Sequence, residues 1–193
     1  MKPSNQHGIV VIGGSAGSLD PLRTILSHVP LHFPMPFVVI THRMKNVKSL
    51  FSRLFRDITK LKVLEVEDKM PINNAYLYIA PTNYHLLIEE DYSFALDYSE
   101  PENFSRPSIN PTFETAAEVY KKKTFAILLS GANDDGLDGL IRVKQKGGTI
   151  IVQDPATAEY PTMPQSAINA NIVDIILSPE EIASYLKKLA IKQ

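Results

Sequence analysis

The sequence contains no cysteine, which excludes thiol nucleophiles, disulfide bonds and cysteine-based zinc sites. No apolar run approaches the roughly 20 residues that a membrane-spanning helix needs. The first residues, MKPSNQHG, lack the apolar segment of a signal peptide. The net charge of −1 provides no basic surface for nucleic acid or anionic lipid. We therefore expect a cytoplasmic protein that neither binds nucleic acid nor inserts into a membrane.

The sequence does contain short apolar runs that alternate with helix-like stripes. Its 193 residues, 44% of them hydrophobic, suit one domain over residues 1–193 with a polar tail at 1–7. We expect strands at 8–12, 37–41, 61–66, 75–80, 85–89, 93–97, 124–130, 149–153 and 173–177. We expect helices at 22–29, 50–55, 110–120, 137–146, 163–170 and 179–188. This order predicts an α/β fold, a doubly wound, mainly parallel sheet with helices on both faces. The three closely spaced strands between 75 and 97 predict a small antiparallel piece from the middle of the chain.

Three of the predicted strands end in residues that could act together. The first ends at GGSAG, which contains Ser15, and the second ends at His42. The strand at 124–130 leads into SGANDDG, which contains Asp134 and Asp135. Ligands of such sheets bind at the carboxyl ends of the strands. A serine nucleophile, a histidine base and an orienting aspartate would form a hydrolytic triad, with the serine oxygen about 2.6–3.2 Å from a histidine nitrogen.

Each of these residues also has a structural interpretation. The glycine-rich turn could cap a helix or cradle a phosphate, His42 could be a surface residue, and NDDG could form an Asx turn. The phosphate alternative is the weakest, although Arg43 could meet a 2′-phosphate. The chain has no G-x-G-x-x-G spacing, no P-loop and no acid after the second strand.

These motifs resemble the catalytic domain of the CheB-type protein-glutamate methylesterases of bacterial chemotaxis. The resemblance extends from about residue 8 to 186 and identifies Ser15, His42 and Asp135 as the catalytic serine, histidine and aspartate. A shift of one residue would put Arg43 in place of His42, but arginine cannot act as a base near neutral pH. The similar segments, in chain order, are VVIGGSAGSLDPL, VVITHRM, EVEDKMPINNAYLYIAPTNYHLLI, RPSINPTFETAA, ILLSGANDDGLDGL and YPTMPQSAI.

The resemblance implies a serine hydrolase that demethylates glutamate γ-methyl esters on the cytoplasmic helices of chemoreceptors and can deamidate glutamines. Ser15 would attack the γ-carbonyl, His42 would carry the proton to departing methanol, and Asp135 would hold His42. No cofactor and no metal are implied. The residues expected at or near the oxyanion-binding part of the site are Ala16, Gly17, Ala132 and Met163.

The chain departs from the family pattern in two regions. A threonine and two glycines usually follow the nucleophile, where this chain has Ala16, Gly17 and Ser18, and Ala132 stands where methionine is common. These departures favour an alternative function, a non-catalytic adaptor that binds receptors or signalling partners. The family's enzymes also carry an amino-terminal receiver domain. Because the first predicted strand begins near residue 8, we expect a stand-alone domain that is constitutively accessible or regulated by a partner in trans.

Overall fold

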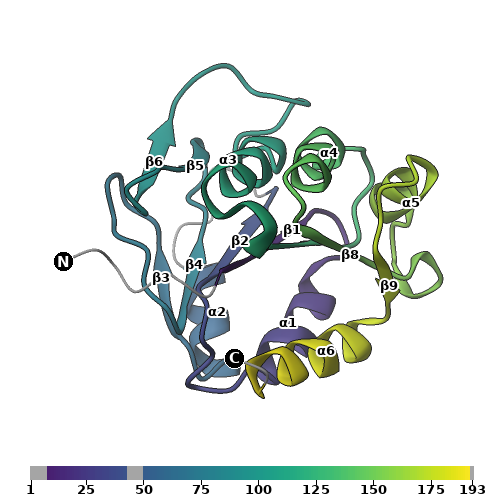
Figure 1. Cartoon of the computed structure of the whole chain (residues 1–193), viewed down its shortest axis with the longest axis horizontal. Helices are drawn as coiled ribbons and strands as arrows, with labels where there is room; N and C mark the ends of the chain where they lie inside the picture. Colours follow the sequence, from purple (N-terminus) through teal and green to yellow (C-terminus); the bar gives the residue numbers. More distant parts are fainter. Residues whose placement is uncertain (1–7, 43–49, 192–193) are drawn as a thin grey trace.

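A computed structural model describes residues 8–42 and 50–191, and Figure 1 shows how its elements are arranged. The predicted tail at 1–7 and Arg43 lie outside the described residues. The strands are β1 (Ile9–Gly14), β2 (Phe37–Thr41), β3 (Lys62–Glu65), β4 (Tyr76–Ile79), β5 (His85–Ile88), β6 (Phe94–Asp97), β7 (Thr124–Leu128), β8 (Thr149–Gln153) and β9 (Ile175–Leu177). The helices are α1 (Leu19–Ser27), α2 (Leu50–Ile58), α3 (Asn110–Tyr120), α4 (Leu137–Gln145), α5 (Thr162–Asn169) and α6 (Pro179–Ile191), with short 3-10 helices at η1 (Lys121–Lys123) and η2 (Pro155–Thr157).

Seven of the strands form one parallel sheet in the order β3-β4-β2-β1-β7-β8-β9. β5 and β6 form a separate antiparallel pair. The predicted α/β fold with its small antiparallel piece is therefore confirmed. The chain builds one half of the sheet from β1 outward and then begins the other half at β7, so the direction of winding switches beside β1.

The antiparallel pairing predicted for the strand at 75–80 is wrong, because this strand, β4, belongs to the main sheet. β4 lies between β3 and β2 in the main sheet and runs parallel to both. Its side chains explain this position, because Leu77 and Ile79 are buried in one core and Tyr78 in the other. A strand with apolar residues on both faces is typical of the interior of a parallel sheet.

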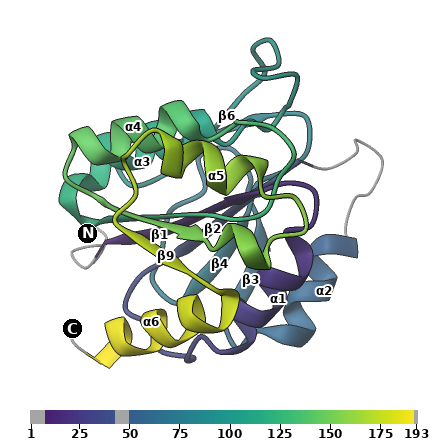
Figure 2. The same ribbon diagram turned by 90° about the vertical axis from the view of Figure 1, so that its right-hand side faces the viewer.

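Two hydrophobic cores cover the two faces of the sheet. In β1, Ile9 and Val11 contribute to the core under α3 and α4, whereas Val10 and Ile12 contribute to the core against α1 and α6. Figures 1 and 2 show α3, α4 and α5 on one face and α1, α2 and α6 on the other. Successive residues of a strand point to opposite faces, so a continuous β-branched run is what a sheet covered on both sides requires.

The pairing of the central strands aligns their carboxyl ends. Gly14 of β1 is the register partner of Thr41 of β2, and Gly13 is the partner of Leu128 of β7. The chain therefore leaves three adjacent strands at the same edge of the sheet. At this edge, Ser15 follows β1, His42 follows β2, and the loop that contains Asp135 follows β7. No helix in the described ranges is long and apolar enough to cross a membrane.

Candidate active site

His42 and Asp135 are in direct contact, although they lie 93 residues apart in the chain. Nε2 of His42, which follows β2, is 2.6 Å from Oδ2 of Asp135, in the loop between β7 and α4. An ionised carboxylate can only accept hydrogen bonds, so Nε2 carries the proton. Nδ1 of His42 therefore keeps its lone pair and is the nitrogen able to accept a proton from a nucleophile.

Asp135 is fully buried and is held by groups that precede helix α3. Ser108 Oγ donates to its Oδ1 at 2.7 Å, and the Ile109 N–H donates to its Oδ2 at 2.8 Å. The carboxylate thus faces the amino end of α3, where backbone N–H groups lack partners within the helix and favour a negative charge.

These contacts set the ionisation of Asp135. Burial by itself raises the pKa of the carboxyl, but hydrogen bonds from His42, Ile109 and Ser108 favour the charged form. Their combined effect outweighs burial, and the pKa lies below its ordinary value. Asp135 is therefore ionised near neutral pH, as the partner of an imidazole that must accept a proton has to be.

Ser15 lies on the turn between β1 and α1, with its backbone fixed on both sides. Its N–H donates to the Ser130 carbonyl at 2.9 Å, and Ser18 Oγ donates to its carbonyl at 2.7 Å. The Ser15 side chain itself is half-buried and has no hydrogen-bond partner among the described residues. The Ser15–His42 hydrogen bond thus stays a prediction, and catalytic hydrogen bonds in sites without substrate are often long.

Ala16 directly follows Ser15, and Ala132 lies two residues after Ser130, whose carbonyl accepts from the Ser15 N–H. Ala16 and Ala132 are exposed, and neither N–H has an acceptor within the described part of the chain. Ser130 fixes both peptide segments, because its Oγ donates to the Ala16 carbonyl at 2.8 Å and it directly precedes Gly131 and Ala132. Paired N–H groups near a nucleophile are the usual donors to the oxyanion of an acyl-transfer reaction.

Met163 packs against the loop that contains Gly131 and Ala132. It is fully buried, its N–H donates to the Gly131 carbonyl at 3.0 Å, and a methyl group on Gly131 would lie only 2.6 Å from its sulfur. A larger residue at 131 would therefore force the Met163 side chain to shift. Because its N–H is already used, Met163 has no free donor for an oxyanion, and its place is structural support for Gly131.

Three residues of this site have contacts that the sequence does not predict. Ser108 and Ile109 fall within the RPSINPTFETAA segment, and Ser130 ends the expected strand at 124–130. Their position in similar segments was the available signal. Nothing in their residue types reveals that one pair binds Asp135 while Ser130 connects two loops.

Gly17 gives a test of how tightly the turn that contains Ser15 is packed. Its φ is +73°, and an added methyl group would lie 2.7 Å from both Glu159 Cβ and Ser130 Oγ. Gly147 has a similar φ of +78°, but a methyl group there would meet nothing closer than 3.8 Å. Gly17→Ala should therefore cost about 1–3 kcal/mol more unfolding free energy than Gly147→Ala, measured by urea denaturation. Equal losses would contradict close packing at the turn.

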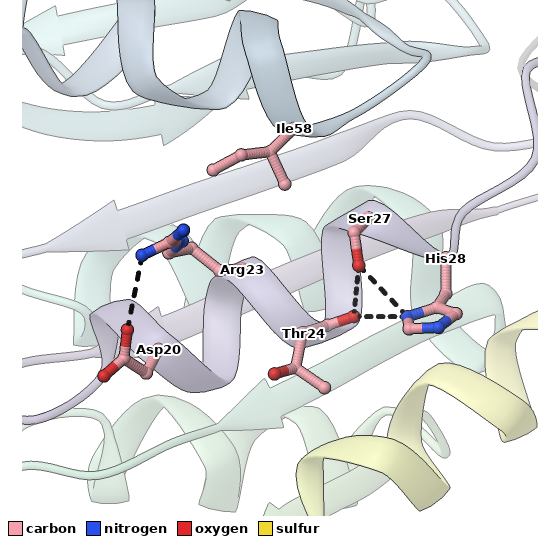
Figure 3. A pocket seen from close by; sticks show the side chains of 6 residues that line it. All are labelled: Asp20, Arg23, Thr24, Ser27, His28 and Ile58. Atoms are coloured by element: carbon pink, nitrogen blue, oxygen red, sulfur yellow. Dashed lines mark hydrogen bonds and ion pairs between the residues drawn. The ribbon is translucent and has the colours of Figure 1, made fainter.

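A hollow of about 440 Å³ along α1 is not part of this site (Figure 3). Its polar side chains already interact within α1, since Arg23 lies 3.8 Å from Asp20 and His28 Nδ1 lies 2.7 Å from the Thr24 carbonyl oxygen. It includes none of the predicted site residues. The described residues also contain no cluster of three or more histidine, aspartate or glutamate side chains that could hold a metal ion.

Known proteins show the same fold and sequence pattern. A family model described as CheB methylesterase matches residues 10–186. A Leptospira interrogans protein, provisionally named protein-glutamate methylesterase/protein-glutamine glutaminase, is 44% identical over 93% of each chain. A Thermotoga maritima protein of the same name is 38% identical over 97% of this chain and 56% of its own length.

A solved structure agrees with these matches. The crystal structure of the Thermotoga maritima CheB methylesterase catalytic domain is similar with a TM-score of 0.92 and 35% identity, covering 95% of this chain and 99% of that one. The family match, the sequence relatives and the shared fold extend over almost the whole chain. The chain therefore belongs to the CheB methylesterase family.

Proposed function

We propose that this chain is a protein-glutamate methylesterase that hydrolyses glutamate γ-methyl esters on the cytoplasmic helices of chemoreceptors and can also deamidate glutamines there. The relatives' names supply the reaction class. The observation that carries the proposal is the 2.6 Å contact between His42 Nε2 and the buried Asp135, which leaves Nδ1 as a base at the edge of the sheet where the half-buried Ser15 lies.

The proposed reaction runs in two balanced halves. Ser15 Oγ attacks the γ-carbonyl carbon, its proton passes to His42 Nδ1, and the carbonyl oxygen becomes an oxyanion. Collapse breaks the bond to the methoxy oxygen, which takes the proton from His42 and leaves as methanol. Water then attacks the acyl-enzyme through the same base, restoring Ser15 and releasing the glutamate carboxylate. From glutamine, ammonia would leave instead of methanol.

The departures at Ala16 and Ala132 are compatible with catalysis. Both residues would contribute backbone N–H groups to the oxyanion, so their side chains need only leave those groups exposed. Ser18 keeps a role in the turn through its bond to the Ser15 carbonyl. The adaptor alternative therefore loses the sequence departures that favoured it, and the enzymatic proposal stands ahead of it.

The proposed function is tested by measuring methanol release from receptor helices that carry glutamate methyl esters. The wild-type chain should release methanol, and a serine-directed phosphonate should label Ser15 and stop the release. Unmethylated helices of the same sequence are the control. Binding to the methylated helices without methanol release or labelling would support the adaptor and overturn the enzyme.

A further inference from the structure

The segment between β6 and α3 ends in a narrow turn with a fully exposed aromatic residue at its tip. Glu102 and Ser105 pair through two backbone hydrogen bonds of 3.2 and 2.9 Å, so Asn103 and Phe104 are the two central residues of a hairpin. The Phe104 side chain is fully exposed to solvent. Figure 2 shows this segment rising beyond the helices of the molecule.

Phe104 is an unfavourable residue for this turn. Asn103 and Phe104 have φ values of +49° and +60°, as a two-residue type I′ turn requires. Such turns favour the sequence Asn-Gly, because the second position is strained for any residue with a large side chain. A phenylalanine here costs both backbone strain and the exposure of an apolar ring. Strain and exposure at one residue point to a role outside the fold.

The turn is also held firmly in place. Glu102 Oε1 accepts a hydrogen bond from Asn110 at the start of α3, at 2.8 Å. On its other side, Arg106 donates to the Ser99 carbonyl at 2.6 Å, and its guanidinium lies 3.9 Å from the centre of the Tyr98 ring. The ring of Phe104 is therefore presented by a fixed turn. It would lose little conformational freedom when a partner covers it.

The turn borders the candidate active site. The side-chain nitrogen of Asn103, Nδ2, lies 3.5 Å from Asp135 Oδ1, so the residue before Phe104 lies beside the His42–Asp135 pair. A helix is about 10–12 Å wide with its side chains. A glutamate side chain that reaches Ser15 would therefore bring the flank of its helix against the rim of the site. A protein substrate that enters the site must meet this rim.

We propose that Phe104 is a specificity-determining contact, which inserts between apolar or small side chains on the helical substrate beside the modified glutamate. This inference rests on the proposed function, since it names how the same site selects its substrate. Exposed aromatic rings that become buried are typical anchors of protein interfaces. The chemistry of ester hydrolysis does not require the ring. The rate of hydrolysis of short unstructured esters should therefore not depend on Phe104.

The test compares wild type with Phe104→Gly on two substrates. One is methylated receptor helices, and the other is a pentapeptide with one glutamate γ-methyl ester. The ratio of kcat/KM for helices to that for the pentapeptide should fall at least tenfold, mainly through KM. Phe104→Tyr should retain most of the wild-type ratio. Leu31→Ala is the matched control, because Leu31 is also an exposed apolar residue but precedes β2 at the opposite edge of the sheet.

Two further measurements separate this role from structural damage and from the reaction itself. The Tm of Phe104→Gly should equal or exceed that of wild type, because glycine relieves the positive φ. Binding of methylated helices, titrated in a Ser15→Ala background, should weaken at least tenfold when Phe104→Gly is added. If wild type releases no methanol but binding still weakens, the proposed function fails and the docking role stands. An unchanged ratio and unchanged binding would overturn the role, as would a ring that only mediates self-association in sedimentation experiments.

Discussion

Ser15→Ala should lower methanol release from methylated receptor helices by about 10⁶-fold, because removal of the nucleophile of a serine triad costs that order of rate. His42 and Asp135 would remain in contact, but no oxygen would be left to form the acyl-enzyme. The free energy of unfolding should change by less than about 0.5 kcal/mol, because the Ser15 side chain has no hydrogen-bond partner among the described residues. Methanol assays and urea denaturation of the same preparations measure both quantities.

Ser27→Ala is the matched control for Ser15→Ala. Ser27 ends α1, the helix that follows the Ser15 turn, is exposed, and its hydroxyl interacts only with its neighbours, the Thr24 carbonyl at 3.0 Å and His28 Nδ1 at 3.1 Å. It should keep wild-type activity. Residual activity above about a tenth of wild type in Ser15→Ala would exclude Ser15 as nucleophile, because triad serines tolerate no such replacement.

Asp135→Asn should lower the rate of methanol release by about 10⁴-fold while leaving the fold intact. The amide oxygen can still accept from His42 and Ile109, and the amide nitrogen can donate to Ser108, whose hydroxyl rotates. What is lost is the negative charge that stabilises the imidazolium. Asp134→Asn is the control, because Asp134 is exposed and its side chain has no hydrogen bond within the described ranges. Equal losses in the two variants would contradict the assignment of Asp135.

The difference in unfolding free energy between wild type and Asp135→Asn should depend on pH. The pKa of Asp135 is lower in the folded chain than its ordinary value of about 3.9. Above that value the ionised carboxylate contributes stability, and the contribution is lost as the pH falls through the folded-state pKa. The unfolding free energy of wild type should therefore exceed that of Asp135→Asn most near neutral pH, with the gap closing below about pH 4. A gap that widened on acidification would be incompatible with a stabilised carboxylate.

The fold could be predicted from the sequence because its strongest signals are local. The apolar runs that became β1, β2, β7 and β8 and the helical stripes between them alternate as a doubly wound sheet requires. The position of β4 in the main sheet could not be predicted from such local patterns. Tyr76–Ile79 is short and is followed closely by two other strands, and only its pairing partners reveal that it belongs to the main sheet.

The sequence also predicts which strand ends form the candidate site, but not all the contacts within it. Ser15, His42 and Asp135 each follow a recognisable strand, and the order of strands brings those ends together. The contacts that hold Asp135 depend on how α3 approaches the sheet, so Ser108 and Ile109 gave no signal of their own. The role proposed for Phe104 could not be predicted from the sequence for a different reason. Only the φ of the turn shows that a glycine would suit this position better.

The separation of His42 and Asp135 in the chain has a consequence for biosynthesis. Their contact joins residues 93 positions apart, and β1 must pair with both β2 and β7 before it can form. Loop closure over such distances makes parallel pairing slow, and a chain emerging from the ribosome reaches Asp135 only after most of its length has been made. Nascent and partly folded chains would thus lack hydrolytic activity, and its appearance during refolding would report the completion of the sheet.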